Sequence, residues 1–127
     1  MMDKTQQGSI KVLQECIDLQ LKKASDYQNP NSTIVQADYY PSGCRTILET
    51  MSSKVLRMRS VMEAMQYDEN YSPNFESLED SAKDLINYAS FFVSYSRGEM
   101  DGQNPNRDWL NRPKYEAPVR LVPRNGD

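Results

Sequence analysis

The residues of this chain most suited to chemistry are the acidic ones that open a predicted helix near residue 75. In the stretch NFESLEDSAKDLINY, residues three or four apart place carboxylates and one amide within an arc of roughly 80°. They are Glu76, Asp80, Asp84 and Asn87, with Glu79 beside them. Helical bundles use such a stripe to bind a divalent metal or a nucleotide phosphate. Ordinary solvated helix faces carry the same pattern, so both interpretations stay open.

The helix dipole explains only some of these acidic residues. Carboxylates in a first helical turn are stabilised by the positive end of the dipole, which accounts for Glu76, Glu79 and Asp80 without any function. Asp84 lies one turn further along, where this stabilisation has faded. If the stripe binds a metal ion, the predicted ligands are Glu76, Glu79, Asp80 and Asp84.

The chain contains no histidine and two cysteines, Cys16 and Cys44. The lack of histidine removes the commonest general base and metal ligand and excludes the catalytic triads that depend on it. Two scattered cysteines are too few for a disulfide framework or a zinc site, and we expect them to be buried thiols. Any chemistry must therefore use carboxylates, lysine, arginine, tyrosine or a metal held by carboxylates.

Basic and aromatic residues elsewhere supply further candidates. Lys54 and Arg57 are one turn apart at the edge of an apolar helix stripe. Such a pair can bind a phosphate or extend into solvent. Tyr39 and Tyr40 lie in a loop, where they can stack on a base or cover the core.

Three helices must position these residues, and apolar periodicity predicts all three. They run from about Thr5 to Tyr27, from Cys44 to Gln66 and from Phe75 to Arg97, with Gly98 as the final stop. A structureless loop is expected over residues 28–43. The predicted fold class is all-α, a bundle of three main helices followed by an extended C-terminal arm.

The predicted helices carry more apolar surface than three helices can bury. The first has two apolar strips, so we expect it to be buried on two sides. The strips are Ile10, Leu13, Ile17, Leu21 and Ala24, and Val12, Cys16 and Leu19. On the third helix, the acidic arc continues into Tyr88, Phe91 and Tyr95. These surfaces predict a homo-oligomer.

The sequence changes character after Gly98. Residues 99–127 have no helical period and are rich in proline, yet Trp109 and Leu110 are too apolar for a pure linker. We therefore divide the chain into a helical core, 1–98, and an extended arm, 99–127. The arm is expected to lie across its own core or a neighbouring subunit, the alternative being a disordered tail.

Composition excludes several classes of protein. With 127 residues and a net charge of −3, the chain forms one domain and lacks the basic excess of a dedicated nucleic-acid binder. No segment approaches the ~20 apolar residues of a membrane span, and the N-terminus lacks the apolar run of a signal peptide. We expect a cytoplasmic protein with no membrane partner.

Three stretches carry a resemblance to a known family. They are KASDY at Lys23–Tyr27, MSSKVLRM at Met51–Met58, and ESLED followed by DLINY within Glu76–Tyr88. Over about residues 10–98 the chain resembles the nucleotide-modification-associated domain 1 family, itself similar to the MazG-like all-α nucleoside triphosphate pyrophosphatases. The resemblance implies a helical bundle that handles nucleotides in a phage setting, and so in the host cytoplasm.

The resemblance also assigns roles to residues. The wider superfamily holds magnesium with an E-x-x-E and an E-x-x-D motif. Asp80 stands at the Asp position of the second motif, whereas Lys54 and Arg57 stand in the first, where they can hold phosphate directly. The ligand-binding residues expected on these grounds are Lys23, Asp26, Tyr27, Tyr39, Tyr40, Lys54, Arg57 and Asn87, with Mg²⁺ as a candidate cofactor.

Two functions remain open at this point. The first is a nucleotide-binding protein, with or without magnesium-assisted hydrolysis of its ligand. The second is a non-catalytic assembly protein, in which the acidic stripe pairs with the basic residues as an internal salt-bridge network.

Overall fold

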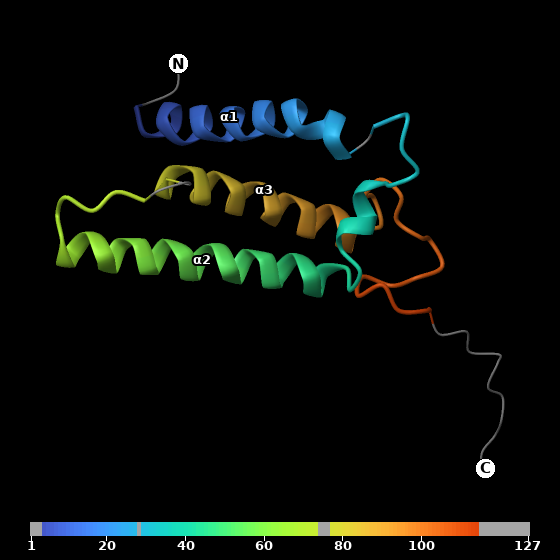
Figure 1. Ribbon diagram of the computed structural model, residues 1–127. Coiled ribbons are helices and arrows are strands. Elements are labelled where there is room, and N and C mark those ends of the chain that lie inside the picture. Colours follow the sequence, from blue (N-terminus) through green and yellow to red (C-terminus); the bar gives the residue numbers. More distant parts are fainter. Residues whose placement is uncertain (1–3, 28, 74–76, 115–127) are drawn as a thin grey trace, which may run out of the picture.

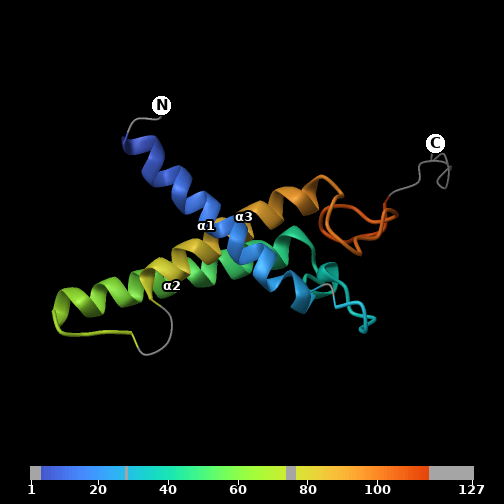
Figure 2. The same cartoon turned by 90° about the horizontal axis from the view of Figure 1, so that it is seen from above.

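The computed structural model describes residues 4–27, 29–73 and 77–114, and within them the chain is helical. Its elements are α1 (Lys4–Tyr27), the short 3-10 helix η1 (Gln36–Tyr39), α2 (Cys44–Tyr67) and α3 (Leu78–Ser96). The helices α2 and α3 lie side by side, and α1 crosses α3 on the opposite side from α2 (Figures 1 and 2). The predicted all-α class with three main helices is confirmed. None of the described helices combines the length and the apolar character that crossing a membrane requires.

A capping box sets the start of α3 at Leu78, later than the predicted Phe75. The Ser77 hydroxyl accepts a hydrogen bond from the Asp80 amide (3.0 Å), and the Ser77 amide donates to the Asp80 carboxylate (3.4 Å). This reciprocal pair satisfies two amides that have no partner within the helix. The side chain of Asp80 is therefore used to begin the helix.

The end of α3 follows the predicted glycine signal. Gly98 adopts φ 75°, a left-handed conformation that residues with a Cβ rarely adopt. Its amide donates to the Tyr95 carbonyl and the Glu99 amide donates to the Ser94 carbonyl, both at 2.9 Å. These two bonds form a Schellman motif, so the helix ends one residue before the predicted Arg97.

The core lies where α2 and α3 meet the loop before α2 and the segment after α3. Its buried residues are Tyr40, Cys44, Ile47, Tyr95 and Met100. The loop predicted to be structureless contains η1, because the amides of Asp38 and Tyr40 donate to carbonyls three residues back. This turn directs Tyr40 inward. Both cysteines are free and buried, as predicted.

The described part of the C-terminal arm, residues 99–114, folds back on its own core. Met100 is buried, Trp109 packs edge-to-face against Phe92 with ring centroids 6.4 Å apart, and the Gln103 amide donates to the Tyr95 carbonyl at 2.8 Å. Of the two arrangements expected for the arm, this part takes the intramolecular one. Residues 115–127 lie outside the described residues.

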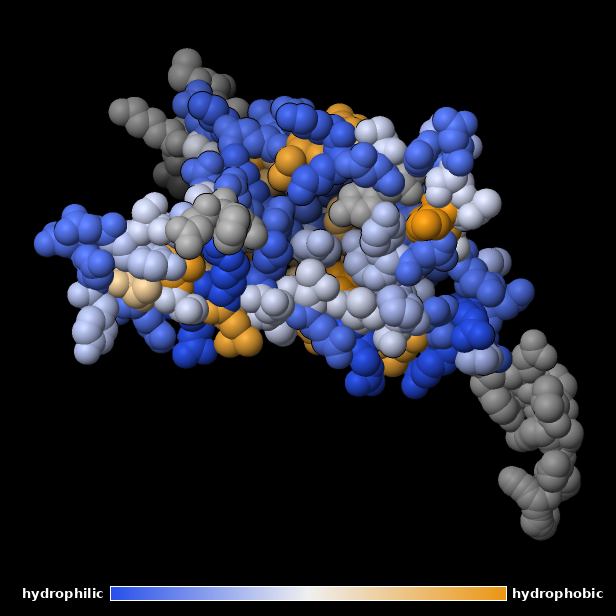
Figure 3. Space-filling view, in the orientation of Figure 1, coloured by the Kyte–Doolittle hydropathy of each residue, from blue (hydrophilic) through white to orange (hydrophobic). Residues whose placement is uncertain are grey.

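The expectation that α1 is buried on two sides is wrong for the single chain. Cys16, in the smaller apolar strip, is 2% exposed, whereas Ile17 and Leu21, in the larger strip, are 56% and 70% exposed. Hydrophobic side chains are open to solvent over α1 and along α2 (Figure 3). The cause is that α1 turns its smaller apolar strip and the polar residues beside it towards α3.

Candidate functional site

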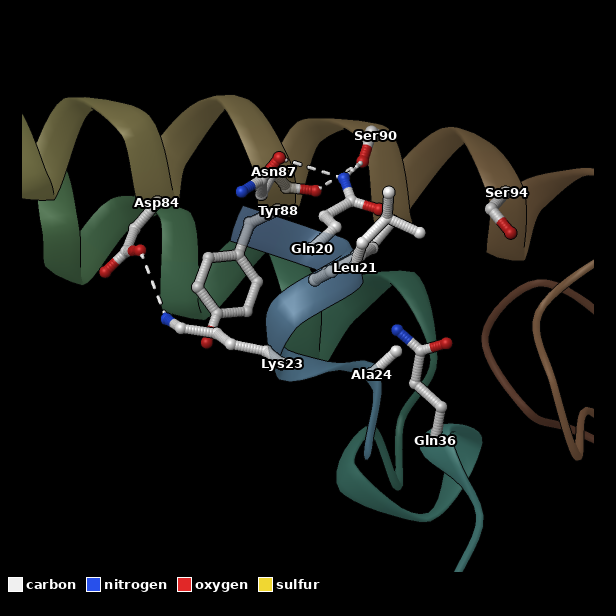
Figure 4. Close-up of a pocket in the computed structure, with 11 residues that line it drawn as sticks. Gln20, Leu21, Lys23, Ala24, Gln36, Asp84, Asn87, Tyr88, Ser90 and Ser94 are labelled. Carbon is white, nitrogen blue, oxygen red and sulfur yellow. Dashed lines mark hydrogen bonds and ion pairs between the residues drawn. The ribbon is translucent and has the colours of Figure 1, made fainter. Parts of the chain in front are cut away.

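Asp84 lies at the junction of the three helices. One oxygen of its carboxylate is 3.0 Å from the Lys54 ammonium on α2, and the other is 3.8 Å from the Lys23 ammonium on α1 (Figure 4). The side chains of Asp84 and Lys54 are only 20% and 21% exposed, while that of Lys23 is 49% exposed. Three predicted site residues from three helices therefore meet at one point. Asp84 is also the acidic residue that the helix dipole does not explain.

A cavity of about 500 Å³ opens beside this junction, between α1 and α3. Lys23 and Asp84 lie at one end of it, and Gln36 of η1 borders it at the other (Figure 4). Its walls combine amide, hydroxyl, aromatic and aliphatic groups. The remaining lining residues are Gln20, Leu21, Ala24, Asn87, Tyr88, Ser90, Phe91 and Ser94. This size and this mixture of apolar walls with a few polar groups are typical of small-molecule sites.

Two amides are held in fixed positions on the cavity wall. The Gln20 side-chain amide donates to the Asn87 side-chain oxygen and to the Ser90 hydroxyl, each at 2.9 Å. Asn87 is 7% exposed, so its side-chain orientation is fixed by burial and by this bond. Such groups can recognise the donor and acceptor pattern of a ligand without reorganising.

Arg57 lies one turn along α2 from Lys54, and its guanidinium is 3.4 Å from the hydroxyl of the fully buried Ser81 on α3. Neither Arg57 nor Lys54 lines the cavity, and Lys54 is connected to it through its contact with Asp84. The predicted basic pair is thus directed towards α3, with Lys54 at the junction and Arg57 behind it. The alternative, in which the side chains of Lys54 and Arg57 extend into solvent, is wrong for Lys54.

The other acidic residues of the stripe have separate partners. Glu79 is 3.2 Å from the Lys83 ammonium, which also lies 2.9 Å from Glu15 on α1, and Asp80 takes part in the capping box of α3. Among the residues that the structure describes, no three histidine, cysteine or acidic side chains come together as metal ligands. Three of the predicted magnesium ligands are therefore spread apart, and Glu76 lies outside the described residues.

The ion pair between Glu15 and Lys83 also attaches α1 to α3. The hydrogen bond from Lys83 lowers the pKa of the Glu15 carboxyl below its usual value, and the same bond raises the pKa of the Lys83 ammonium. Both shifts favour the charged forms. Lys83 is occupied by this pair, whereas Lys23 lines the cavity and Lys54 contacts Asp84 at its end.

The remaining predicted ligand residues are not in the cavity wall. Tyr40 is 4% exposed and packs against Phe91 with ring centroids 6.5 Å apart, which supports its alternative role as a core residue. Tyr39 is 49% exposed and lies outside the cavity lining, as does the exposed Asp26. The side chain of Tyr27 lies outside the described residues.

Sequence reasoning missed several lining residues. Tyr88 and Phe91 were recognised only as an aromatic continuation of the acidic arc and were assigned to a subunit contact. That arc was the available signal, because it places Tyr88 one turn from Asp84. Gln20, Gln36 and Ser90 carry no spacing signal, since their convergence depends on how α1 crosses α3.

No family model, curated protein or solved structure matches this chain.

Proposed function

We propose that this protein binds a nucleotide or a nucleotide-derived small molecule in the cavity between α1 and α3. The observation that carries the proposal is the convergence of Lys23 and Lys54, from different helices, on Asp84 at one end of that cavity. Ammonium groups from two helices meet at this point, and a phosphate is an anion that two such groups can bind together. The resemblance to a nucleotide-handling family points to the same ligand class.

The rest of the cavity suits a base and a sugar. Tyr88 and Phe91 offer aromatic surface for stacking, and Asn87 and Gln20 offer fixed amide groups for hydrogen bonding. Serine hydroxyls line the same wall. In this arrangement the phosphates lie at the lysine end of the cavity, and the base lies towards η1.

Binding without a metal is the form of the proposal that the contacts support. Glu79, Asp80 and Asp84 each have another partner, so these residues do not fit a shared magnesium site as they stand. Hydrolysis would need a metal-activated water and ligands supplied in part by Glu76. A magnesium requirement is therefore tested directly in the experiment below.

A second candidate function is an assembly protein without a ligand. The observation in its favour is the Lys54–Asp84 pair itself, which is 3.0 Å long and four-fifths buried. Such a pair can hold helices in register without binding anything. Under this alternative, the cavity is a by-product of the polar packing of α1.

The test is a thermal-shift screen of the full chain against nucleoside mono-, di- and triphosphates and cyclic nucleotides, with and without magnesium. A ligand at a hundredfold excess over its dissociation constant adds about 2.7 kcal/mol to the free energy of unfolding. A shift that needs no magnesium and is lost in Lys54→Met supports the proposal, and Lys22→Met, on the exposed side of α1, is the matched control. A magnesium-dependent shift indicates the hydrolase, and no shift with any nucleotide refutes nucleotide binding.

A further inference from the structure

The face that α1 leaves open to solvent is the most apolar one that it has. Four large aliphatic residues lie on it at helical spacing: Ile10, Leu13, Ile17 and Leu21, which are 36%, 49%, 56% and 70% exposed. At 100° per residue they fall within an arc of about 80° and extend for about 17 Å along the helix. An isolated chain rarely exposes such a continuous stripe.

The face that α1 turns towards α3 combines the smaller apolar strip, in which Val12 and Leu19 are half-buried, with several polar side chains. Its contacts are the Glu15–Lys83 ion pair, the Gln20 bonds to Asn87 and Ser90, the Lys23–Asp84 contact, and the buried Cys16. The packing of α1 within the chain therefore leaves its larger hydrophobic surface unused. This is the reverse of what a helix does when its only partner is its own core.

We infer that a second copy of this chain covers the stripe, with the two α1 helices antiparallel and related by a two-fold axis near residue 15. Pairing about that axis places Ile10 opposite the partner's Leu21 and Leu13 opposite the partner's Ile17. The stripe is therefore complementary to itself when reversed, as a two-fold interface requires.

The charges beside the stripe support the same register. Lys11 and Asp18 are exposed and lie within about 20° of each other around the helix, on one flank of the stripe. In an antiparallel pair of helices related by a two-fold axis, each flank of one helix lies next to the same flank of the other. Lys11 therefore faces the partner's Asp18, and the opposite charges meet twice in the dimer.

The interface also reaches the candidate site. Leu21 belongs to both the apolar stripe and the lining of the cavity. In the antiparallel pair, the partner's Ile10 packs on Leu21 and so forms part of the cavity rim. Each cavity is then completed by a residue from the other subunit. The dimer does not depend on a ligand, so dimer formation and nucleotide binding can be tested separately.

The test measures the mass of the full chain in solution by light scattering. The wild type is expected to be a dimer, and Ile17→Asp a folded monomer with an unchanged circular dichroism spectrum, because Ile17 is exposed within one chain. The matched control is Leu56→Asp, at a residue of α2 that is 60% exposed, which should remain dimeric. A monomeric wild type, or a dimer broken by Leu56→Asp and not by Ile17→Asp, overturns the inference.

Register is tested by disulfide formation and by charge reversal. The double variant Ile10→Cys/Leu21→Cys should form a covalent dimer, while each single variant should not, because like residues lie about 16 Å apart in the antiparallel pair. Lys11→Glu should raise the dimer dissociation constant about two- to fivefold, and adding Asp18→Lys should restore it. Cross-linking by the single variants would show a parallel pair and overturn the inference.

Discussion

Replacing Asp84 by asparagine separates the competing accounts of the site. In the ligand-free protein the substitution removes the carboxylate shared by Lys54 and Lys23. The side chains of Lys54 and Asp84 are both about four-fifths buried. The loss of stability should therefore exceed that from breaking a surface ion pair and approach that from breaking a hydrogen bond to a charged group. We expect the free energy of unfolding to fall by about 1–3 kcal/mol. For a chain of this length, each kcal/mol lowers the Tm by about 3–5 °C.

The effect on binding should have the opposite sign. If a phosphate binds the two lysines, the Asp84 carboxylate competes with it and repels it at a separation of about 5 Å. Removing that charge should tighten phosphate binding by about 1–2 kcal/mol, roughly five- to thirtyfold. The variant is then less stable when empty and gains more stability from its ligand.

The assay is a calorimetric titration with the nucleotide that gives the largest thermal shift, on the wild type and on Asp84→Asn, without magnesium. Glu63→Gln makes the same change in net charge on an exposed part of α2 and should alter neither stability nor affinity. Weaker binding in Asp84→Asn would refute the competition argument and indicate that the carboxylate itself contacts the ligand. A stability loss with no ligand found would favour the salt-bridge network of an assembly protein.

Three further predictions test the fold that supports the site. Gly43 adopts φ 59°, and a Cβ there would overlap a carbonyl of the C-terminal segment, so Gly43→Ala should lower the free energy of unfolding by about 1–3 kcal/mol in chemical denaturation. Gly8 lies in open space within α1, so Gly8→Ala should raise it by about 0.5–1 kcal/mol. Equal effects of the two substitutions would contradict the structure. Burial raises the pKa of both cysteine thiols, so they should react with a thiol reagent only on unfolding, and rapid labelling of native protein would count against the packing. Hydrogen bonds from Arg112 lower the pKa of the Asp108 carboxyl. The stability that this carboxylate gives to the fold is therefore complete above about pH 4 and declines as the pH falls further. The Tm of Asp108→Asn should depend less steeply on acid pH than that of the wild type, and parallel curves would refute this.

The sequence was sufficient for the helices because their signals are local. Apolar periodicity and breaker residues fixed α2 to within one residue of its predicted end, and Gly98 marked the end of α3. The start of α3 was misplaced because the Ser77–Asp80 capping box is a competing local signal that overrides acidic residues upstream. The turn at η1 was missed for a similar reason, since it depends on backbone bonds and on one bond from the Val35 amide to the Asp38 carboxylate.

The site was predictable only where one helix face decides it. Asp84 and Asn87 were singled out by the acidic stripe, and Lys54 by its place at the edge of an apolar stripe and by the family resemblance. That Lys54 and Asp84 meet is seen only in the structure. Tyr40 was assigned to a ligand because a loop tyrosine gives no indication of its direction, and the structure buries it. The amide wall of Gln20 and Asn87 depends on the crossing of α1 over α3, which apolar periodicity does not predict. Periodicity predicted that both apolar strips of α1 are buried, whereas the larger strip is exposed.

The most direct test of nucleotide binding in this cavity is an amide NMR titration of the full chain with a mixture of the four deoxynucleoside triphosphates, without magnesium. The proposal predicts saturable shifts that cluster at Lys23, Lys54 and Asp84 and continue along α3 through Tyr88. Shifts confined to other surfaces, or no saturable shifts at all, would contradict it.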